Sequence, residues 1–356
     1  MKILHSADLH LDSAFSGRGA EETAYLRQEL LKIPGKLSAL CREHGCDLML
    51  LAGDLFDGAW TPESVHALKI ALKEAAVPIF ISPGNHDFCV AGSPWMSETW
   101  PENVHIFKKN VIESVSLPEI DCRIYGAAFT GMDCDALLEN FQKEGEETYH
   151  IAVLHGDTLQ KKSPYNPISQ AQVASSGLSY LALGHVHKTG SFRVGQTLCA
   201  WPGCPMGRGY DELEEKGILL VELQQQADIA FIPLDGPRFY DLEAPILMDP
   251  VSALEAALPA VGNRDYYRIT FTGECDALDL VQLATQFGQF PNLELRDHTS
   301  PVADPWISLG EDSLQGVYFG ILHDALSSAD EKEREIIQLA AKISRSILDG
   351  REVALP

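Results

Sequence analysis

Short apolar runs alternate with helical patterns along the first two-thirds of the chain. The apolar runs are 2–7, 47–52, 77–82, 123–129, 150–154 and 178–183. Because nearly every position in them is apolar, we expect strands buried on both faces, as in a sheet covered by helices. Between the first runs, 21–44 and 62–74 place apolar residues at helical spacing. The pattern predicts an α/β fold.

Beyond about residue 241 the pattern changes to that of a smaller unit. The segments 266–272, 277–287 and 293–295 are typical of a strand, a helix and a second strand. In the tail, Ser328 and Glu331 have the spacing of a capping box, which predicts the start of a last helix. We therefore predict a main domain at 1–244, a small α/β cap domain at 245–325 and a C-terminal helix element at 326–356.

Acidic residues outnumber basic ones by a wide margin. With 51 Asp and Glu against 27 Lys and Arg, the formal net charge is −24. A protein that binds nucleic acid alone usually has a basic face, so any DNA contact must be local or supplied by a partner. The chain shows no signal peptide and no apolar stretch long enough to span a membrane, and its eight cysteines are scattered. We therefore expect a cytoplasmic protein with reduced thiols.

Polar residues with metal-binding side chains follow the ends of the apolar runs. They are Asp8, His10, Asp54, Asn85, His86, His155, His185 and His187. In layered α/β folds, ligands gather at the carboxyl ends of strands. Oxygen and nitrogen donors without thiolate suit Mn²⁺, Fe or Zn²⁺. The other histidines are expected at the surface or in hydrogen bonds.

The order D-x-H, G-D, G-N-H-D, H-G and G-H-x-H resembles the calcineurin-like metallophosphoesterases. That resemblance implies a four-layer fold, with a β-sandwich core flanked by helices, and a site for two divalent metal ions that hydrolyses phosphoesters. His86 is then the group that stabilises the transition state or protonates the leaving oxygen. The implied ligands are Asp8, His10 and His187 for one metal and Asn85, His155 and His185 for the other, with Asp54 between them.

Several segments narrow the resemblance to the SbcD/YhaO branch of DNA-repair nucleases. They are His5–Ser13, Gly53–Asp57, Pro202–Gly203 and Glu215–Gly217. The branch implies a Mn²⁺-dependent DNA exonuclease with a cap domain, a homodimer and an SMC-like coiled-coil ATPase as partner. A helix at 330–349 is a candidate docking element for that partner. The chain contains no P-loop, so any use of ATP has to come from the partner.

One residue departs from this branch and leaves a second function open. SbcD-type nucleases have His three residues after the metal-bridging Asp, whereas this chain has Asp57. In phosphoprotein phosphatases an Asp stands there and orients the catalytic His, so Asp57 is predicted to accept a hydrogen bond from His86. The alternatives are therefore a phosphatase or small-molecule phosphodiesterase, and a scaffold with a structural metal. The basic residues predicted near the cleft, as candidates for phosphate contacts, are Lys161, Lys162, Lys188, Arg193 and Arg208.

Overall fold

The computed structural model describes residues 1–213, 215–302 and 304–350. The chain forms two compact units, Met1–Phe239 and Tyr240–Pro356. The predicted boundary after residue 244 falls inside strand β13 (Phe239–Ile246), which belongs to the sheet of the second unit. No helix in the described ranges is long and apolar enough to cross a membrane.

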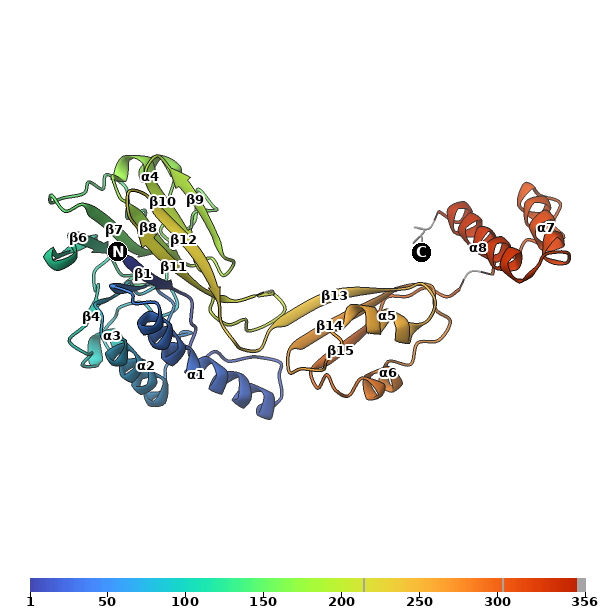
Figure 1. The fold of residues 1–356 in the computed structure, drawn as a ribbon, viewed down its shortest axis with the longest axis horizontal. Helices are drawn as coiled ribbons and strands as arrows, with labels where there is room; N and C mark the ends of the chain where they lie inside the picture. Colours follow the sequence, from blue (N-terminus) through green and yellow to red (C-terminus); the bar gives the residue numbers. More distant parts are fainter. Residues whose placement is uncertain (214, 303, 351–356) are drawn as a thin grey trace. The chain divides into compact units, whose positions relative to one another are not determined.

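Two six-stranded sheets make up the first unit (Figure 1). The first sheet has the order β12 (Ala227–Pro233), β11 (Gly217–Leu223), β1 (Lys2–Ser6), β2 (Leu48–Leu51), β3 (Ile79–Ile81) and β4 (Val104–Ile106). The second has the order β5 (Glu113–Leu117), β6 (Cys122–Gly126), β7 (Tyr149–His155), β8 (Tyr180–Gly184), β10 (Thr197–Trp201) and β9 (Gly190–Val194). Strands β1 to β4 run parallel, as do β6, β7, β8 and β10. Their carboxyl ends therefore meet at one edge of each sheet.

The main core of this unit lies between the two sheets. Ile3, Leu50 and Phe80 from the first sheet share one buried cluster with Ile124 and Val153 from the second. Helices cover the outer faces: α1 (Ala20–Glu43), α2 (Pro62–Ala75) and α3 (Pro94–Ser97) on the first sheet, and α4 (Gln170–Ser176) on the second. A short 3₁₀ turn, η1, spans Pro118–Ile120. The predicted α/β fold, with a β-sandwich core flanked by helices, is confirmed.

The second unit contains a small sheet with two helices. The sheet has the order β13, β14 (Tyr266–Gly273) and β15 (Leu293–Asp297), and β14 and β15 are parallel. Helices α5 (Pro250–Ala257) and α6 (Leu280–Gln286) contribute Leu254 and Leu283 to a core that they share with Ile269 and Phe271 of β14. The predicted strand, helix and strand are confirmed as β14, α6 and β15.

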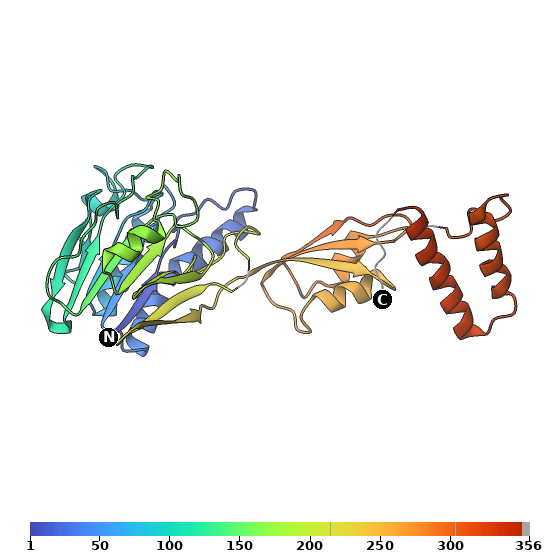
Figure 2. The ribbon, with the colours of Figure 1, turned by 90° about the horizontal axis from the view of Figure 1, so that it is seen from above.

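The described tail ends in a pair of helices, α7 (Leu314–Leu326) and α8 (Glu331–Leu348), which lie side by side (Figure 2). The Tyr318 hydroxyl on α7 and the Ser344 hydroxyl on α8 are 2.7 Å apart. The predicted capping box at Ser328 is wrong, because Asp330 caps α8 and forms the box with Glu333. An Asp carboxylate caps a helix as well as a Ser hydroxyl does, and the Ser328 hydroxyl donates instead to the Ala325 carbonyl at 3.4 Å.

Candidate metal centre

The end of β7 and the loops that follow β1, β2, β3 and β8 bring the predicted site residues together. Tight turns make this convergence feasible, because Asp8, His10 and Asp54 adopt φ values of 53°, 47° and 52°. Non-glycine residues seldom occupy this left-handed region, and they do so mainly where the surrounding structure enforces it. Both Asp8 and Asp54 are only 1% exposed. The turns therefore hold carboxylates inside the protein at the edge where the parallel strands end.

A first group of donors consists of Asp8, His10 and His187. The Nε2 atoms of His10 and His187 are 3.2 Å apart. The Asp8 carboxylate lies 3.9 Å from His187 Nε2 and accepts the His185 backbone N–H at 3.0 Å. This backbone bond fixes the carboxylate next to the loop that carries His187.

A second group of donors consists of Asp54, Asn85, His155 and His185. The amide oxygen of Asn85 is 3.0 Å from His155 Nε2 and 3.3 Å from His185 Nδ1. The Asp54 carboxylate lies 3.3 Å from His155 Nε2 and 3.9 Å from His10 Nε2. Asp54 therefore stands between the two groups and is within reach of both.

Hydrogen bonds at Nδ1 orient three imidazoles of the site so that their Nε2 atoms face the other donors. The Nδ1 atom of His10 faces Asp57 at 3.1 Å, that of His155 faces the Ala52 carbonyl at 2.8 Å, and that of His187 faces Glu212 at 2.7 Å. Carboxylate and carbonyl oxygens only accept, so each Nδ1 carries a proton, and each Nε2 offers a lone pair to a cation once it has released any proton of its own. The Nε2 atoms of His10 and His187 are close enough to share either a proton or a cation. Such hydrogen bonds at Nδ1 are typical of metal-binding histidines, so these residues fit a divalent cation.

Burial and neighbouring charges raise the pKa values of His155 and Asp87 in this cluster and lower that of Asp54. Burial alone would lower the pKa of His155, but the Asp54 carboxylate outweighs it and raises that pKa to about 9. Burial would raise the pKa of Asp54, yet the charges of His155 and His10 hold it well below its usual range. Burial and the neighbouring Asp54 raise the pKa of Asp87 to about 7. The site therefore concentrates buried negative charge that a proton or a metal cation stabilises.

His86 occupies a different position, at the exposed rim of the site. Its side chain is 46% exposed, and its Nδ1 lies 3.1 Å from the Asp57 carboxylate. The hydrogen bond to Asp57 raises the pKa of His86. The His86 backbone N–H donates to Asp54 at 2.8 Å, which ties this residue to the centre of the cluster. His86 thus faces solvent with a raised pKa, as suits a proton donor to a substrate.

Two residues that support the site were not recognised in these roles from the sequence. Glu212 is 4% exposed and accepts from His187, and the Arg208 guanidinium donates to Glu212 at 2.6 Å. The same guanidinium lies 3.6 Å from Asp57. Arg208 therefore connects the carboxylate that orients His187 with the one that holds His10 and His86. Both residues lie in a turn region without periodic apolar residues, so only their spacing of four residues hints at a pair.

Asp87 also has a structural role that the sequence did not indicate. Its buried carboxylate accepts the backbone N–H groups of Gly84 at 2.7 Å and Leu55 at 2.8 Å. These bonds join the loop after β2 to the loop after β3. Asp87 therefore holds Asp54 and Asn85 in place, rather than serving as one of the converging donors.

Comparisons with known proteins agree with this geometry. Residues 1–189 match the family described as calcineurin-like phosphoesterase. The chain is 32% identical over 250 residues to the uncharacterized metallophosphoesterase YhaO of Bacillus subtilis (strain 168), a match that covers 65% of this chain and 59% of that protein. It is 24% identical over 256 residues to the SbcD component of the nuclease SbcCD from the same organism, covering 60% of this chain and 63% of that protein. The chain thus spans less than two thirds of either relative.

Among solved structures, the chain is similar to TT1561 of Thermus thermophilus. It matches 65% of this chain and 98% of its own length at 14% identity, with a TM-score of 0.40.

Proposed function

The chain belongs to the calcineurin-like phosphoesterase family, and from this premise we propose that it is a metal-dependent phosphodiesterase that cleaves DNA. The main support for the proposal is the arrangement of His10, His155 and His187. Their Nδ1 atoms form hydrogen bonds to oxygens, while their Nε2 atoms face buried carboxylates. This arrangement orients the imidazoles for divalent cations before any substrate arrives.

We assign two cations to the two groups of donors. Asp8, His10 and His187 would hold one and Asn85, His155 and His185 the other, with Asp54 within reach of both groups. Oxygen and nitrogen donors without thiolate fit Mn²⁺, Fe or Zn²⁺, and the resemblance to the nuclease branch favours Mn²⁺ among them. When bound, such a pair of cations lowers the pKa of an attacking water and neutralises charge on the phosphoryl oxygens.

The remaining residues bind, orient and transfer a proton. His86 donates a proton to the leaving oxygen, since it is exposed at the rim and its pKa is raised by Asp57. Asp57 orients both His86 and His10, and the Ser13 hydroxyl holds it in place with a donated hydrogen bond of 2.8 Å. Arg208 and Glu212 keep His187 in the tautomer that presents Nε2 to the site.

DNA is the substrate that the relatives support best, since one of them is named as part of a nuclease. The contact between His86 and Asp57 supports the second candidate, a phosphatase or nucleotide phosphodiesterase, because phosphoprotein phosphatases resemble this chain at Asp57.

A direct comparison of substrates separates these candidates. We expect Mn²⁺-loaded protein to cleave end-labelled DNA with a kcat/KM at least about tenfold above that for phosphomonoesters and mononucleotides. The measurement is a time course of each substrate at equal protein concentration, with EDTA-treated protein as the control. Faster turnover of the small phosphoesters would favour the phosphatase candidate.

The helices α7 and α8 are our proposed docking site for an SMC-like coiled-coil ATPase. Leu314, Ile321, Ile336 and Ile347 are 87%, 66%, 60% and 62% exposed, so this helix pair presents apolar side chains to solvent. A groove of about 360 Å³ between the helices is lined by Tyr318 and Ile347, among other residues. Exposed apolar surface of this kind marks a protein interaction site.

Charge placed on this apolar surface tests the docking proposal. The double substitution Ile321→Asp and Ile336→Asp is expected to weaken association with the ATPase by more than about 100-fold, because two buried carboxylates would lack partners. Analytical ultracentrifugation of the protein with the ATPase measures this, and hydrolysis of bis(p-nitrophenyl) phosphate should stay unchanged. If the substitutions instead abolish a homodimer of this chain, the surface serves self-association.

A further inference from the structure

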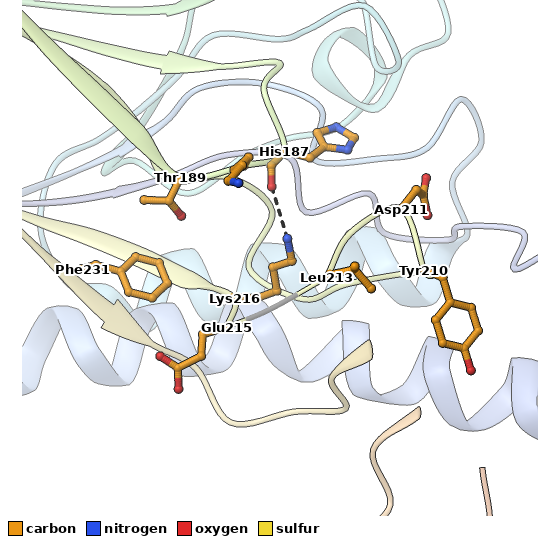
Figure 3. Close-up of a pocket in the computed structure, with 9 residues that line it drawn as sticks. His187, Thr189, Tyr210, Asp211, Leu213, Glu215, Lys216 and Phe231 are labelled. Carbon is orange, nitrogen blue, oxygen red and sulfur yellow. Dashed lines mark hydrogen bonds between the residues drawn. The ribbon is translucent and has the colours of Figure 1, made fainter. Parts of the chain in front are cut away.

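A hollow of about 560 Å³ opens beside His187, on the side of its backbone carbonyl (Figure 3). Its lining includes the cationic side chains of Lys188 and Lys216 and the aromatic rings of Tyr210 and Phe231. A volume of this size suits a ligand of a few ring systems. Because His187 belongs both to the candidate metal centre and to this lining, a ligand in the hollow lies beside a residue of that centre.

The cations of the hollow are available to an anion. Lys188 is exposed, and Lys216 is half-buried. Among the described residues, the hydrogen bond of the Lys216 ammonium is the long one of 3.4 Å to the His187 carbonyl. An ammonium group has three donors, so further donors of Lys216 remain for a phosphate oxygen. Lys188 and Lys216 therefore supply the positive charge with which this hollow could hold a phosphate.

The aromatic and acidic side chains in the lining limit the size and charge of an anion that the hollow can bind. Phe231, on β12, is half-buried and presents an aromatic side chain to the hollow, as Figure 3 shows. Asp211 and Glu215 also line the hollow and are exposed, with Glu215 paired to Arg238 at 3.5 Å. Their charges would repel a run of several phosphates. The combination therefore suits one phosphate joined to one aromatic base.

We propose that this hollow binds the nucleotide unit adjacent to the scissile phosphate, with its own phosphate on Lys188 and Lys216 and its base against Phe231. The inference rests on the proposed function and deepens it, since it assigns a nucleotide-binding subsite to the same reaction. Base stacking on an aromatic side chain tolerates every base, so the subsite selects nucleotides over simple phosphoesters without reading sequence.

Competitive inhibition tests the subsite separately from the chemistry. Hydrolysis of bis(p-nitrophenyl) phosphate is measured with increasing deoxythymidine 5′-monophosphate, and separately with inorganic phosphate, which has no base. In Phe231→Leu and in Lys216→Gln we expect the inhibition constant of the nucleotide to rise about tenfold. The inhibition constant of inorganic phosphate should change less than about twofold in Phe231→Leu, because Leu removes only the aromatic face. Lys73→Gln, an exposed lysine on α2, is the matched control and should change neither constant.

Equal inhibition constants for the nucleotide in Phe231→Leu and the unsubstituted protein would overturn the subsite. If the unsubstituted protein hydrolyses no phosphoester, the proposed function fails, and calorimetric titration with deoxythymidine 5′-monophosphate then decides on the subsite alone. Binding that Phe231→Leu weakens about tenfold would support it. Absence of binding, or equal binding to both proteins, would refute it. Thermal unfolding of each variant verifies that the fold is intact.

Discussion

Asp54→Asn is expected to weaken the binding of divalent cations by more than about 100-fold and to abolish phosphoester hydrolysis. Substituting a residue that only orients a metal ligand costs about 10–100-fold in metal affinity, and Asp54 would supply a charged oxygen to both cations. The substitution keeps the side-chain oxygen that accepts the His86 N–H at 2.8 Å, so the loop geometry is preserved. The measurement is the metal content after dialysis, together with the metal affinity from calorimetry.

Thermal unfolding provides a second readout of the Asp54 prediction. Because a ligand that binds only the folded state raises its stability, Mn²⁺ should raise the unfolding temperature of the unsubstituted protein but not of Asp54→Asn. Asp133→Asn, at an exposed position, is the matched control and should behave as the unsubstituted protein. Retention of two cations per chain in Asp54→Asn would show that Asp54 is not a shared ligand.

His86→Asn is expected to lower kcat by about 10²–10⁴-fold for esters with alkoxide leaving groups while metal content is unchanged. The proposed role of His86 is to donate a proton to the leaving oxygen, and its half-exposed ring at the rim is outside the two donor groups assigned to the cations. A p-nitrophenolate leaving group requires little protonation, so the loss for bis(p-nitrophenyl) phosphate should be much smaller. Parallel kinetics with a DNA substrate and with this ester measure the difference.

The decrease in kcat that His86→Asn causes with the DNA substrate, divided by the decrease with bis(p-nitrophenyl) phosphate, separates proton donation from other roles of His86. Equal loss for the DNA substrate and the activated ester would mean that His86 stabilises the transition state by charge alone. Loss of metal would mean that it supports the cations instead. His66→Asn, at an exposed histidine on α2, is the matched control for loss of an imidazole.

The fold could be predicted where burial alone decides the structure. The runs that are apolar at nearly every position became β1, β2, β3, β6, β7 and β8, because such segments are stable only between other layers. The strand, helix and strand of the second unit followed from the same reasoning. The start of the last helix did not, because Ser328 and Asp330 are both good caps and only the packing of the helix selects between them.

The candidate site could be predicted as far as its residues follow strands. Parallel strands of one sheet end at a common edge, so Asp8, Asp54 and Asn85 come together without further information. Glu212 and Arg208 escape this reasoning, because they belong to a turn whose path depends on tertiary contacts. Asp57 and Asp87 have the same side chain, and only their three-dimensional surroundings give them different roles. Asp57 faces the imidazoles of His10 and His86, whereas the Asp87 carboxylate accepts hydrogen bonds from backbone N–H groups.

The segment 208–213 contributes both to the metal centre and to the neighbouring hollow, so natural selection cannot change one of them there without affecting the other. Its Glu212 orients His187, while its Tyr210 and Asp211 line the neighbouring hollow. Substitutions that move this segment to admit another ligand would therefore also disturb an imidazole of the metal centre. Phe231 lies on β12 instead, outside that segment. Divergence of substrate preference among descendants of this protein is thus expected to begin at Phe231, where a change has fewer pleiotropic effects.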